Sequence, residues 1–294
     1  MFMWFVRRTL QIRLRQEKVL TFIRQATTAL STLSNPTKKL FMEVLTAVVQ
    51  LEIIPSAPDE NLERMESFIR QATKQGAQLV VFPEDAITGP LAGQTAFVAR
   101  AAEFLAACQS LAVKYSVDLV PGSWTAQLDG LLFNVAYYIN KDGSVAGSYR
   151  KINLWETEKA ILTPGTAVSV FPTAYGLVGL IICWDVSFPA MFAEMVRQGV
   201  KLVISPTYWS FPISVDSKDD VDDEILLIDS LCTTRAFENN IVFVYCNAAG
   251  ELKTDDLHVV LGGRSQITHP LDKVLCKAEG NEEEMLLAKV SIDD

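Results

Sequence analysis

The sequence predicts a layered α/β fold formed by a single domain of about 250 residues. From Glu43 onward, strand-like and helix-like stretches alternate, and no long Gly/Ser/Pro-rich linker interrupts them. Residues 178–183 form a continuous apolar run, which is typical of a strand buried on both faces. The chain has 294 residues, of which 49% are hydrophobic, so it can bury a full core and is not mainly disordered.

The elements of the first half are identified by hydrophobic periodicity and by the residues that end them. Residues 44–54 are rich in β-branched side chains and end at Pro55, so they predict a strand. Residues 61–75 place apolar side chains on one helical face and stop at Gly76, so they predict a helix. The next predicted elements are a strand at 78–82, a helix at 96–115, a strand at 118–120, and a hairpin of 131–140 and 144–151 across Asp142-Gly143.

The second half continues the alternation after the apolar strand at 178–183. Two helix-then-strand units follow, and the end of the chain, residues 258–292, predicts three strands. The units are 190–198 with 202–205, and 224–239 with 241–245. The acidic run 216–224 predicts a solvated loop leading into the second helix, with a calcium loop as an alternative that lacks the EF-hand spacing.

Residues 1–41 differ from the rest of the chain in charge. Residues 1–40 hold eight basic groups and one acidic group, which resembles an organelle transit peptide. The alternative is an upstream start, with Met42 as the working initiator. Either way we treat residues 1–41 as a basic leader outside the fold, and residues 42–294 as the domain.

The composition excludes several classes of function. The chain has 26 basic and 35 acidic side chains, a formal charge of −9, so nucleic acid is not an expected partner. Five cysteines without a C-x-x-C pair argue against a disulfide framework and a zinc site, and two histidines argue against a His-rich metal site. The opening apolar run is too short to span a membrane. We expect a cytoplasmic protein, or an organelle-targeted one if the leader acts as a signal.

Four polar side chains lie at the ends of predicted strands or shortly after them, where ligands bind in layered α/β folds. They are Glu84, Lys151, Glu158 and Cys183. The motifs around them are V-V-F-P-E-D-A-I-T-G-P (80–90), Y-R-K-I-N-L-W (149–155), E-K-A-I-L-T-P-G (158–165) and G-L-I-I-C-W-D-V-S-F-P (179–189), with P-x-Y-W (206–209), R-A-F-E-N (235–239) and Asn247. In this order they resemble the amidase-like branch of the nitrilase superfamily of carbon-nitrogen hydrolases, over residues 43–292.

The resemblance implies a four-layer α-β-β-α sandwich, a homodimer packed through outer helices or a higher homo-oligomer, and no cofactor or metal. Chemistry agrees with its catalytic roles: Cys183 is the nucleophile and Glu84 the general base, while Lys151 stabilises the oxyanion. Glu158 is the fourth member by resemblance, and Glu156 is an alternative for that role. A Cys-His hydrolase using His258 or His269 is a rival that lacks motif support. Another alternative is a protein of the same fold that has no catalytic activity and binds a partner.

Five aromatic residues next to these positions are candidates for the substrate pocket. They are Trp155, Trp184, Phe188, Tyr208 and Trp209. Nitrilases more often carry Trp-Glu after the nucleophile, so Asp185 favours an amidase. The predicted reaction is therefore hydrolysis of a small amide or carbamoyl amide through a thioester, with nitrile hydrolysis as the alternative.

Overall fold

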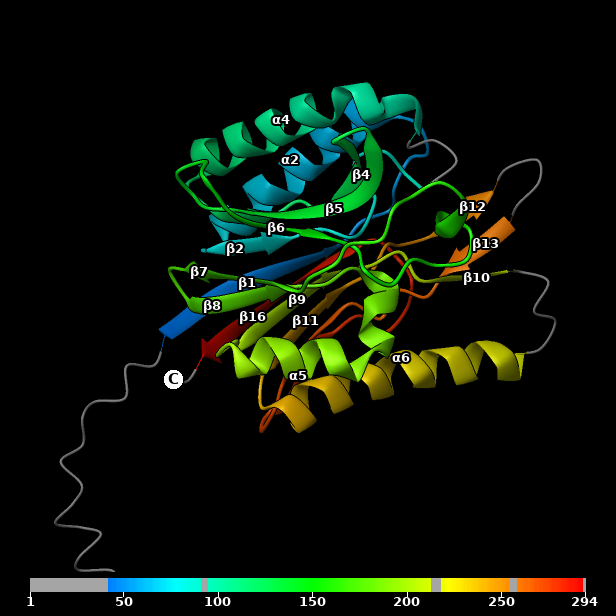
Figure 1. Ribbon diagram of the computed structural model, residues 1–294. Coiled ribbons are helices and arrows are strands. Elements are labelled where there is room, and N and C mark those ends of the chain that lie inside the picture. The colour runs from blue at the N-terminus through cyan, green and yellow to red at the C-terminus, as the bar shows by residue number, and fades with distance from the viewer. Residues whose placement is uncertain (1–41, 91–94, 213–217, 254–257, 293–294) are drawn as a thin grey trace, which may run out of the picture. The chain divides into compact units, whose positions relative to one another are not determined.

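Two large β-sheets form the centre of the computed structural model, which describes residues 42–90, 95–212, 218–253 and 258–292 (Figure 1). The predicted leader lies outside the described residues. The strands of the first sheet are, in spatial order, β16 (Glu284–Ile292), β1 (Met42–Gln50), β2 (Leu79–Val81), β3 (Asp118–Val120), β5 (Leu131–Ile139) and β4 (Ser123–Leu128), and β6 (Val145–Arg150) pairs with β5.

The second sheet lies against the first. Its strands are, in spatial order, β15 (Lys273–Lys277), β14 (Gln266–His269), β11 (Val242–Cys246), β9 (Leu202–Pro206), β8 (Gly176–Leu180) and β7 (Ser169–Thr173). A smaller third sheet contains β10 (Ser210–Pro212), β13 (His258–Leu261) and β12 (Glu251–Lys253). In the two large sheets, β1, β2 and β3 are parallel, as are β8, β9 and β11, so residues that follow these strands gather at one end.

Helices cover the outer faces of both large sheets (Figure 1). The first sheet is covered by α2 (Pro58–Lys74) and α4 (Ala101–Tyr115), and the second by α5 (Pro189–Arg197) and α6 (Lys218–Asn239). Short 3₁₀ helices lie at η1 (Thr95–Arg100), η2 (Glu158–Ala160) and η3 (Cys183–Ser187). The predicted four-layer α-β-β-α sandwich is confirmed.

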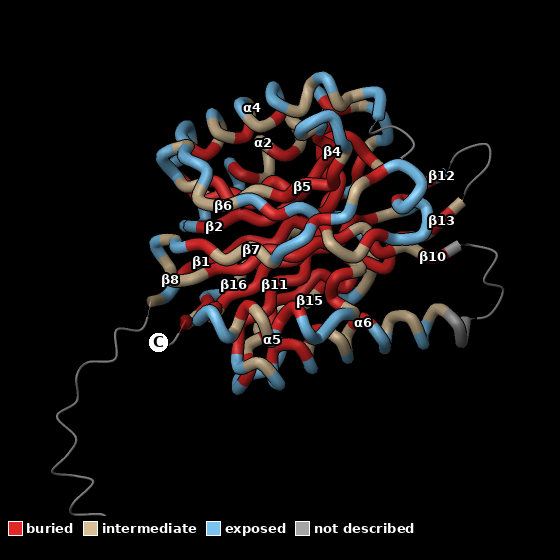
Figure 2. Tube along the Cα trace, viewed as in Figure 1, coloured by how far each residue is buried: buried red, intermediate tan, exposed pale blue. Residues whose placement is uncertain are grey.

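Two apolar cores hold the layers together. One lies between α2, α4 and the first sheet, where Met65 and Phe104 pack against strand residues such as Val80. The other fills the space between the sheets and continues under α5 and α6, where Phe192 packs on Phe243 with ring centroids 5.6 Å apart. Figure 2 shows the central strands buried and the outer helix faces exposed. Because both faces of the central strands are covered, their sequences are nearly uniformly apolar.

The predicted helix at 96–115 is η1 followed by α4. Among the described residues, Thr95–Tyr115 is the segment that is long and apolar enough to cross a membrane by length and composition alone. Phe104, Cys108 and Ala112 of this segment are buried in the first core. A helix that packs one face against a sheet core meets the same criteria, so this is weak evidence for a membrane span.

Two predictions of the second half need correction. Residues 258–292 form four strands, not three, because a turn at residues 270–272 separates β14 from the short β15. The helix α6 begins at Lys218, so most of the acidic run is helical and not a loop. Carboxylates in a first helical turn favour helix formation through the helix dipole. Residues 216–217 of the run lie outside the described residues.

Candidate active site

The four predicted polar residues come from distant parts of the chain. The buried ammonium of one of them, Lys151, lies among the other three. Lys151, which directly follows β6, places its Nζ 2.8 Å from Glu84 Oε1 and 2.8 Å from Glu158 Oε2. Glu84 follows β2, and Glu158 begins η2. Cys183 begins η3, after β8, and its thiol interacts with the Glu84 carboxylate. All four residues are at most 8% exposed, so their charges act in a largely water-free space.

The backbone at Cys183 makes a sharp turn at the end of the buried strand. Its φ is +49°, in the left-handed region that residues with a Cβ rarely adopt. Asp185 closes this turn, because its Oδ2 accepts a hydrogen bond of 3.0 Å from the Ile182 N–H. Such strain persists only where the surrounding structure enforces it, and here it presents the thiol at the tip of the strand.

The loop after β9 holds both the carboxylate and the backbone of Glu84. Its Oε2 accepts a hydrogen bond of 3.0 Å from the Tyr208 N–H, and its own N–H donates to the Thr207 carbonyl at 3.3 Å. The preceding residue, Pro83, lies so close to Gly122 that a Cβ there would be 1.9 Å from the Pro83 oxygen. Gly122, with φ +87°, therefore lets the loop after β3 pack against the loop that carries Glu84.

Burial and neighbouring charges set the protonation of the site. Burial raises the pKa of Glu84, opposed by Lys151 and reinforced by Glu158. Burial and Glu84 raise the pKa of the Cys183 thiol. Burial alone would lower the pKa of Lys151, but the acidic groups around it outweigh burial and raise it. The resting site therefore combines a permanent ammonium with a neutral thiol whose proton must leave during attack.

The structure distinguishes Glu158 from Glu156. Glu158 is buried, contacts Lys151, and accepts a hydrogen bond of 2.6 Å from the Trp155 N–H. The Glu156 side chain is 75% exposed and pairs with Lys159. Glu158 is therefore the second carboxylate at the ammonium.

Sequence analysis missed Asn134, which lies at the centre of the site. Its Nδ2 donates to Glu84 Oε1 at 2.8 Å and to Glu158 Oε1 at 3.2 Å. Its backbone carbonyl accepts from the Lys151 N–H at 2.9 Å. The signal in the sequence is one polar residue in the apolar strand L-L-F-N-V-A, because a buried amide needs hydrogen-bond partners.

Asp185 has a structural position beside the nucleophile. It is fully buried, and its carboxylate accepts hydrogen bonds from the Ile182 N–H, the Tyr149 hydroxyl, and both the backbone and side-chain N–H groups of Asn153. These bonds tie the Cys183 turn to the segment that carries Lys151. Because its oxygens are occupied by protein donors, Asp185 positions the segments that carry Cys183 and Lys151.

Two further motif residues support the same region. Arg235 on α6 donates from Nε to the Val186 carbonyl at 2.9 Å, which fixes η3. Asn247 accepts from the Trp209 N–H at 2.8 Å and donates to the Trp209 carbonyl at 3.2 Å. Both residues thus position segments that flank Cys183.

Four of the five predicted aromatic residues form one cluster beside Cys183. The Trp184 ring contacts Trp155, Trp209 and Phe188, with centroid distances of 4.7, 5.4 and 6.3 Å. The fifth, Tyr208, packs toward the first core and gives its backbone N–H to Glu84. Burial raises the pKa of the Tyr208 phenol, and the charges of Asp85 and Glu84 add to this.

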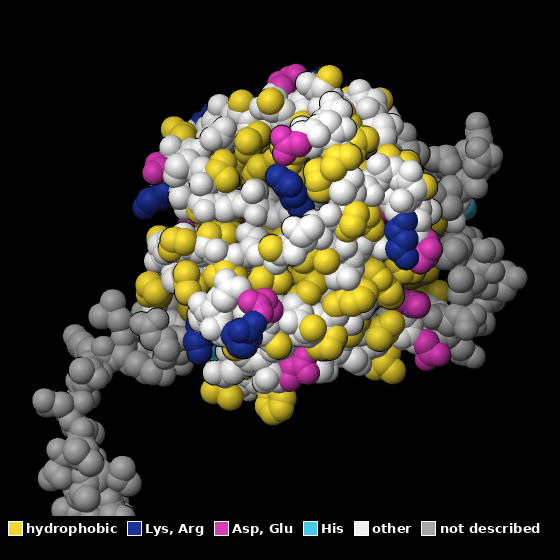
Figure 3. Space-filling view, in the orientation of Figure 1, with side chains coloured by type: hydrophobic (Ala, Val, Ile, Leu, Met, Phe, Trp, Pro, Cys, Tyr) yellow, Lys and Arg dark blue, Asp and Glu magenta, His cyan; other side chains and the backbone are white. Residues whose placement is uncertain are grey.

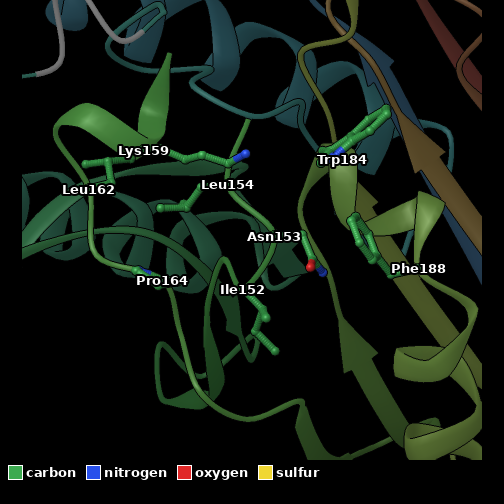
Figure 4. Close-up of a pocket in the computed structure, with 8 residues that line it drawn as sticks. All are labelled: Ile152, Asn153, Leu154, Lys159, Leu162, Pro164, Trp184 and Phe188. Carbon is green, nitrogen blue, oxygen red and sulfur yellow. The ribbon is translucent and has the colours of Figure 1, made fainter. Parts of the chain in front are cut away.

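A cavity of about 400 Å³ opens next to this cluster (Figure 4). Trp184 and Phe188 form one wall, and the segment after β6 forms the other, with Lys159 as the charged lining residue. Its other lining residues are Ile152, Asn153, Leu154, Leu162 and Pro164. Figure 3 shows hydrophobic side chains gathered between the two sheets on this face of the molecule. None of the four catalytic candidates lines the cavity, but its lining residues Ile152, Lys159 and Trp184 directly follow Lys151, Glu158 and Cys183 in the chain.

The remaining ionisable candidates lie elsewhere. His258 pairs with Glu251 and His269 with Asp272, so neither histidine is bonded to Cys183. Within the described ranges, no group of three or more His, Cys, Asp and Glu side chains is arranged to hold a metal ion. The Cys-His alternative therefore has no geometric support.

Known proteins resemble the chain along most of its length. The profile of the carbon-nitrogen hydrolase family matches residues 45–294. A probable nitrilase of Schizosaccharomyces pombe is 29% identical over 242 residues, which are 80% of this chain and 84% of that protein. An omega-amidase of Mus musculus is 30% identical over 259 residues, which are 84% of this chain and 88% of that protein.

Solved structures agree with the sequence relatives. A carbon-nitrogen hydrolase from Helicobacter pylori superposes with a TM-score of 0.78 at 25% identity, over 84% of this chain and 88% of that chain. An amidase from Nesterenkonia superposes with a TM-score of 0.71 at 25% identity, over 84% and 93%. In that amidase, acrylamide adds to the active-site cysteine of a Glu-to-Gln variant. This chain belongs to the carbon-nitrogen hydrolase family, the nitrilase superfamily that its motifs predicted.

Proposed function

We propose that this carbon-nitrogen hydrolase cleaves a small amide or carbamoyl amide through a thioester on Cys183. One observation carries the proposal: the Lys151 ammonium lies between two carboxylates in a buried space that also holds the Cys183 thiol. A charged group this deeply buried costs several kcal/mol of desolvation, so its retention calls for a functional reason. Covalent chemistry on a carbonyl group supplies one.

In the acylation step, the Cys183 sulfur attacks the carbonyl carbon while its proton passes to Glu84. Because the pKa of the thiol is raised, loss of the proton must accompany the attack. The carbonyl oxygen becomes an oxyanion that the Lys151 ammonium stabilises. Glu84 then gives its proton to the nitrogen, the carbon–nitrogen bond breaks, and ammonia or an amine leaves.

In the deacylation step, Glu84 takes a proton from water, whose oxygen attacks the thioester carbon. The carbon–sulfur bond breaks, the acid leaves, and the proton returns to Cys183. Glu158 keeps Lys151 charged and in place throughout, because it forms the second ion pair with the ammonium. These steps use side chains and water only.

The cavity next to Trp184 supports a small, largely apolar acyl group as the part of the substrate that binds there. The omega-amidase and amidase relatives favour an amide, and the probable nitrilase keeps a nitrile as the second candidate. This chain has Asp185 where nitrilases more often have Glu. That difference does not decide between an amide and a nitrile, because Asp185 bonds to protein groups.

The proposal is tested with purified protein and a panel of amides, carbamoyl amides and nitriles, assayed for ammonia or amine release. Wild type should turn over an amide, and mass spectrometry should detect its acyl group on Cys183. Cys183→Ala should abolish both. Lys151→Met should lower kcat/KM by about 10²- to 10³-fold, the usual cost of losing an oxyanion donor.

The matched control is Glu156→Gln, which changes an exposed carboxylate two residues from Glu158. It should keep wild-type kinetics, whereas Glu158→Gln should lower kcat. Equal turnover by Cys183→Ala would overturn the proposal. Turnover of nitriles but not amides would select the second candidate, and no turnover or acylation with any class would favour a silent binding member of the family.

A further inference from the structure

The side chain of Asn134 on β5 joins the two carboxylates of the site. Its amide nitrogen donates to Glu84 Oε1 at 2.8 Å and to Glu158 Oε1 at 3.2 Å, and the residue is 1% exposed. The backbone carbonyl of the same residue accepts from the Lys151 N–H at 2.9 Å. Three of the four proposed catalytic residues are therefore hydrogen-bonded to one asparagine, Glu84 and Glu158 through its side chain and Lys151 through its backbone.

The other fully buried asparagines in the described residues are bonded differently. Asn61 accepts from the Ile54 N–H and donates to the carbonyls of Ile54 and Ile87. Asn247 likewise uses both ends of its amide, toward backbone groups. These two residues connect loops, and each satisfies its donor and acceptor groups, as buried amides normally do.

Asn134 satisfies only its donor end. Its Oδ1 is buried and has no hydrogen-bond partner within the described part of the chain. The orientation of the amide is fixed by its partners, because carboxylates accept hydrogen bonds and an amide oxygen facing them would be repelled. An unpaired buried acceptor destabilises the folded state, so stability alone does not explain an asparagine at this position.

We propose that Asn134 is a positioning residue that keeps both Glu84 and Glu158 turned toward Lys151, and Glu84 ionised next to the single ammonium. The inference rests on the proposed function, because it acts through the general base of that reaction. A hydrogen bond donated to a carboxylate favours its charged form. Two carboxylates that share one cation repel each other, and the amide nitrogen between them reduces that repulsion.

The charged and titratable groups that face Glu84 are few. They are Lys151, Glu158, Cys183, Tyr208 and Tyr245. In Asn134→Asp, the donated hydrogen bonds are lost and a third carboxylate joins this group. The pH at which Glu84 loses its proton should therefore rise by about one unit or more. In Asn134→Ser, a hydroxyl can still donate to one carboxylate, so the rise should be smaller.

The experiment measures two properties against pH for wild type, Asn134→Asp and Asn134→Ser. The first is kcat/KM on the amide that wild type hydrolyses. The second is the rate at which iodoacetamide alkylates Cys183, mapped by peptide mass spectrometry. Alkylation needs no substrate and still reports the base next to the thiol, so it remains readable if the proposed reaction is wrong. Asn61→Asp is the matched control, since it changes a buried amide outside the site.

For Asn134→Asp we expect the acid limb of both pH profiles, where the rate falls with falling pH, to move up by about one pH unit. On that limb kcat should fall by up to about tenfold, and KM should change less than threefold. Asn134→Ser should lie between this variant and wild type. Asn61→Asp should lower the melting temperature and leave both pH profiles unchanged. Wild-type acid limbs in the Asp and Ser variants would overturn the inference, as would a shift of the same size in Asn61→Asp. If Asn134→Asp does not fold, the Ser variant decides between these outcomes.

Discussion

At the scale of single residues, burial decides the pH range in which the site works. Burial raises the pKa of Glu84, so the base gains a proton at a higher pH than an ordinary glutamate does. As pH falls through this raised value, Glu84 becomes protonated and can no longer accept the thiol proton. We therefore expect the acid limb of kcat/KM to lie above the ordinary glutamate range, about pH 4.3. A pH–rate profile with an acid limb below pH 4 would contradict this.

The same profile should show no loss of activity from Lys151 below pH 10. The acidic groups around Lys151 raise its pKa, so the ammonium stays charged across the working range. The thiol also has a raised pKa and is never the standing thiolate that a Cys–His pair would hold. The limbs describe the coupled group as a whole, since Glu84 and Cys183 exchange one proton next to the charged Lys151.

Sequence alone could predict the charged residues of the site but not the groups that hold them. Glu84, Lys151 and Cys183 each lie at the end of a predicted strand or shortly after it, and parallel strands bring such residues to one end of a sheet. Asn134 lies inside a strand, 50 residues from Glu84 in the chain, and only the register of β5 against its neighbours places it there. Asp185 was interpreted as a substrate signal because nitrilases more often carry Glu at that position. Its bonds to Tyr149 and Asn153 span distant segments, so the sequence did not reveal them.

At the scale of elements, one partly buried carboxylate of α6 adds polar bonds to the apolar packing of this helix on the second sheet. Asp229 accepts hydrogen bonds from Arg264, Gln266 and Lys277, which lie on or beside β14 and β15. Partial burial alone would raise the pKa of Asp229, but its bonds to Arg264 and Lys277 outweigh burial and lower it. The folded protein therefore holds this carboxylate ionised more strongly than the unfolded chain does.

Replacing this carboxylate should destabilise the fold in a pH-dependent way. Asp229→Asn should lower stability by about 1–2 kcal/mol, roughly 2–8 °C in Tm, because Arg264 loses a charged partner. The stabilisation is present above the unfolded pKa of Asp and is lost as pH falls through the lowered folded value. The difference in Tm between wild type and Asp229→Asn should thus be largest at pH 7 and become smaller toward pH 3. Asp223→Asn, an exposed change on the same helix, is the control; an equal loss in both variants would refute the prediction.

The strands that sequence analysis missed are β4, β7, β10 and β12, each of which has at most six residues. The strand β7 contains Pro172, which argues against a central strand, and the structure places β7 at the edge of the second sheet, where proline is tolerated. The strands β10 and β12 have three residues each and exist because β13 lies between them. Long periodic elements such as α2 were predicted because their pattern is local, with only their ends shifted.

At the scale of the whole molecule, the leader, the location in the cell and the oligomeric state stay predictions. The leader lies outside the described residues, and the family profile begins at residue 45. A homodimer needs an exposed surface that excludes water when two copies meet. The outer face of α6 offers one: Leu226 and Phe237 are 64% and 63% exposed, and their spacing of three helical turns places them on the same side.

We expect this face of α6 to form the homodimer interface, since two-fold association commonly pairs the same surface on both copies. Multi-angle light scattering should give a dimer for wild type and a monomer for Leu226→Asp/Phe237→Asp, because burying the added carboxylates without partners opposes association. Val113→Asp is the matched control. It changes an apolar side chain of similar exposure, 55%, on α4 at the opposite outer layer, and should stay dimeric. A dimer that survives the α6 changes but not Val113→Asp would move the interface to the first sheet's helices.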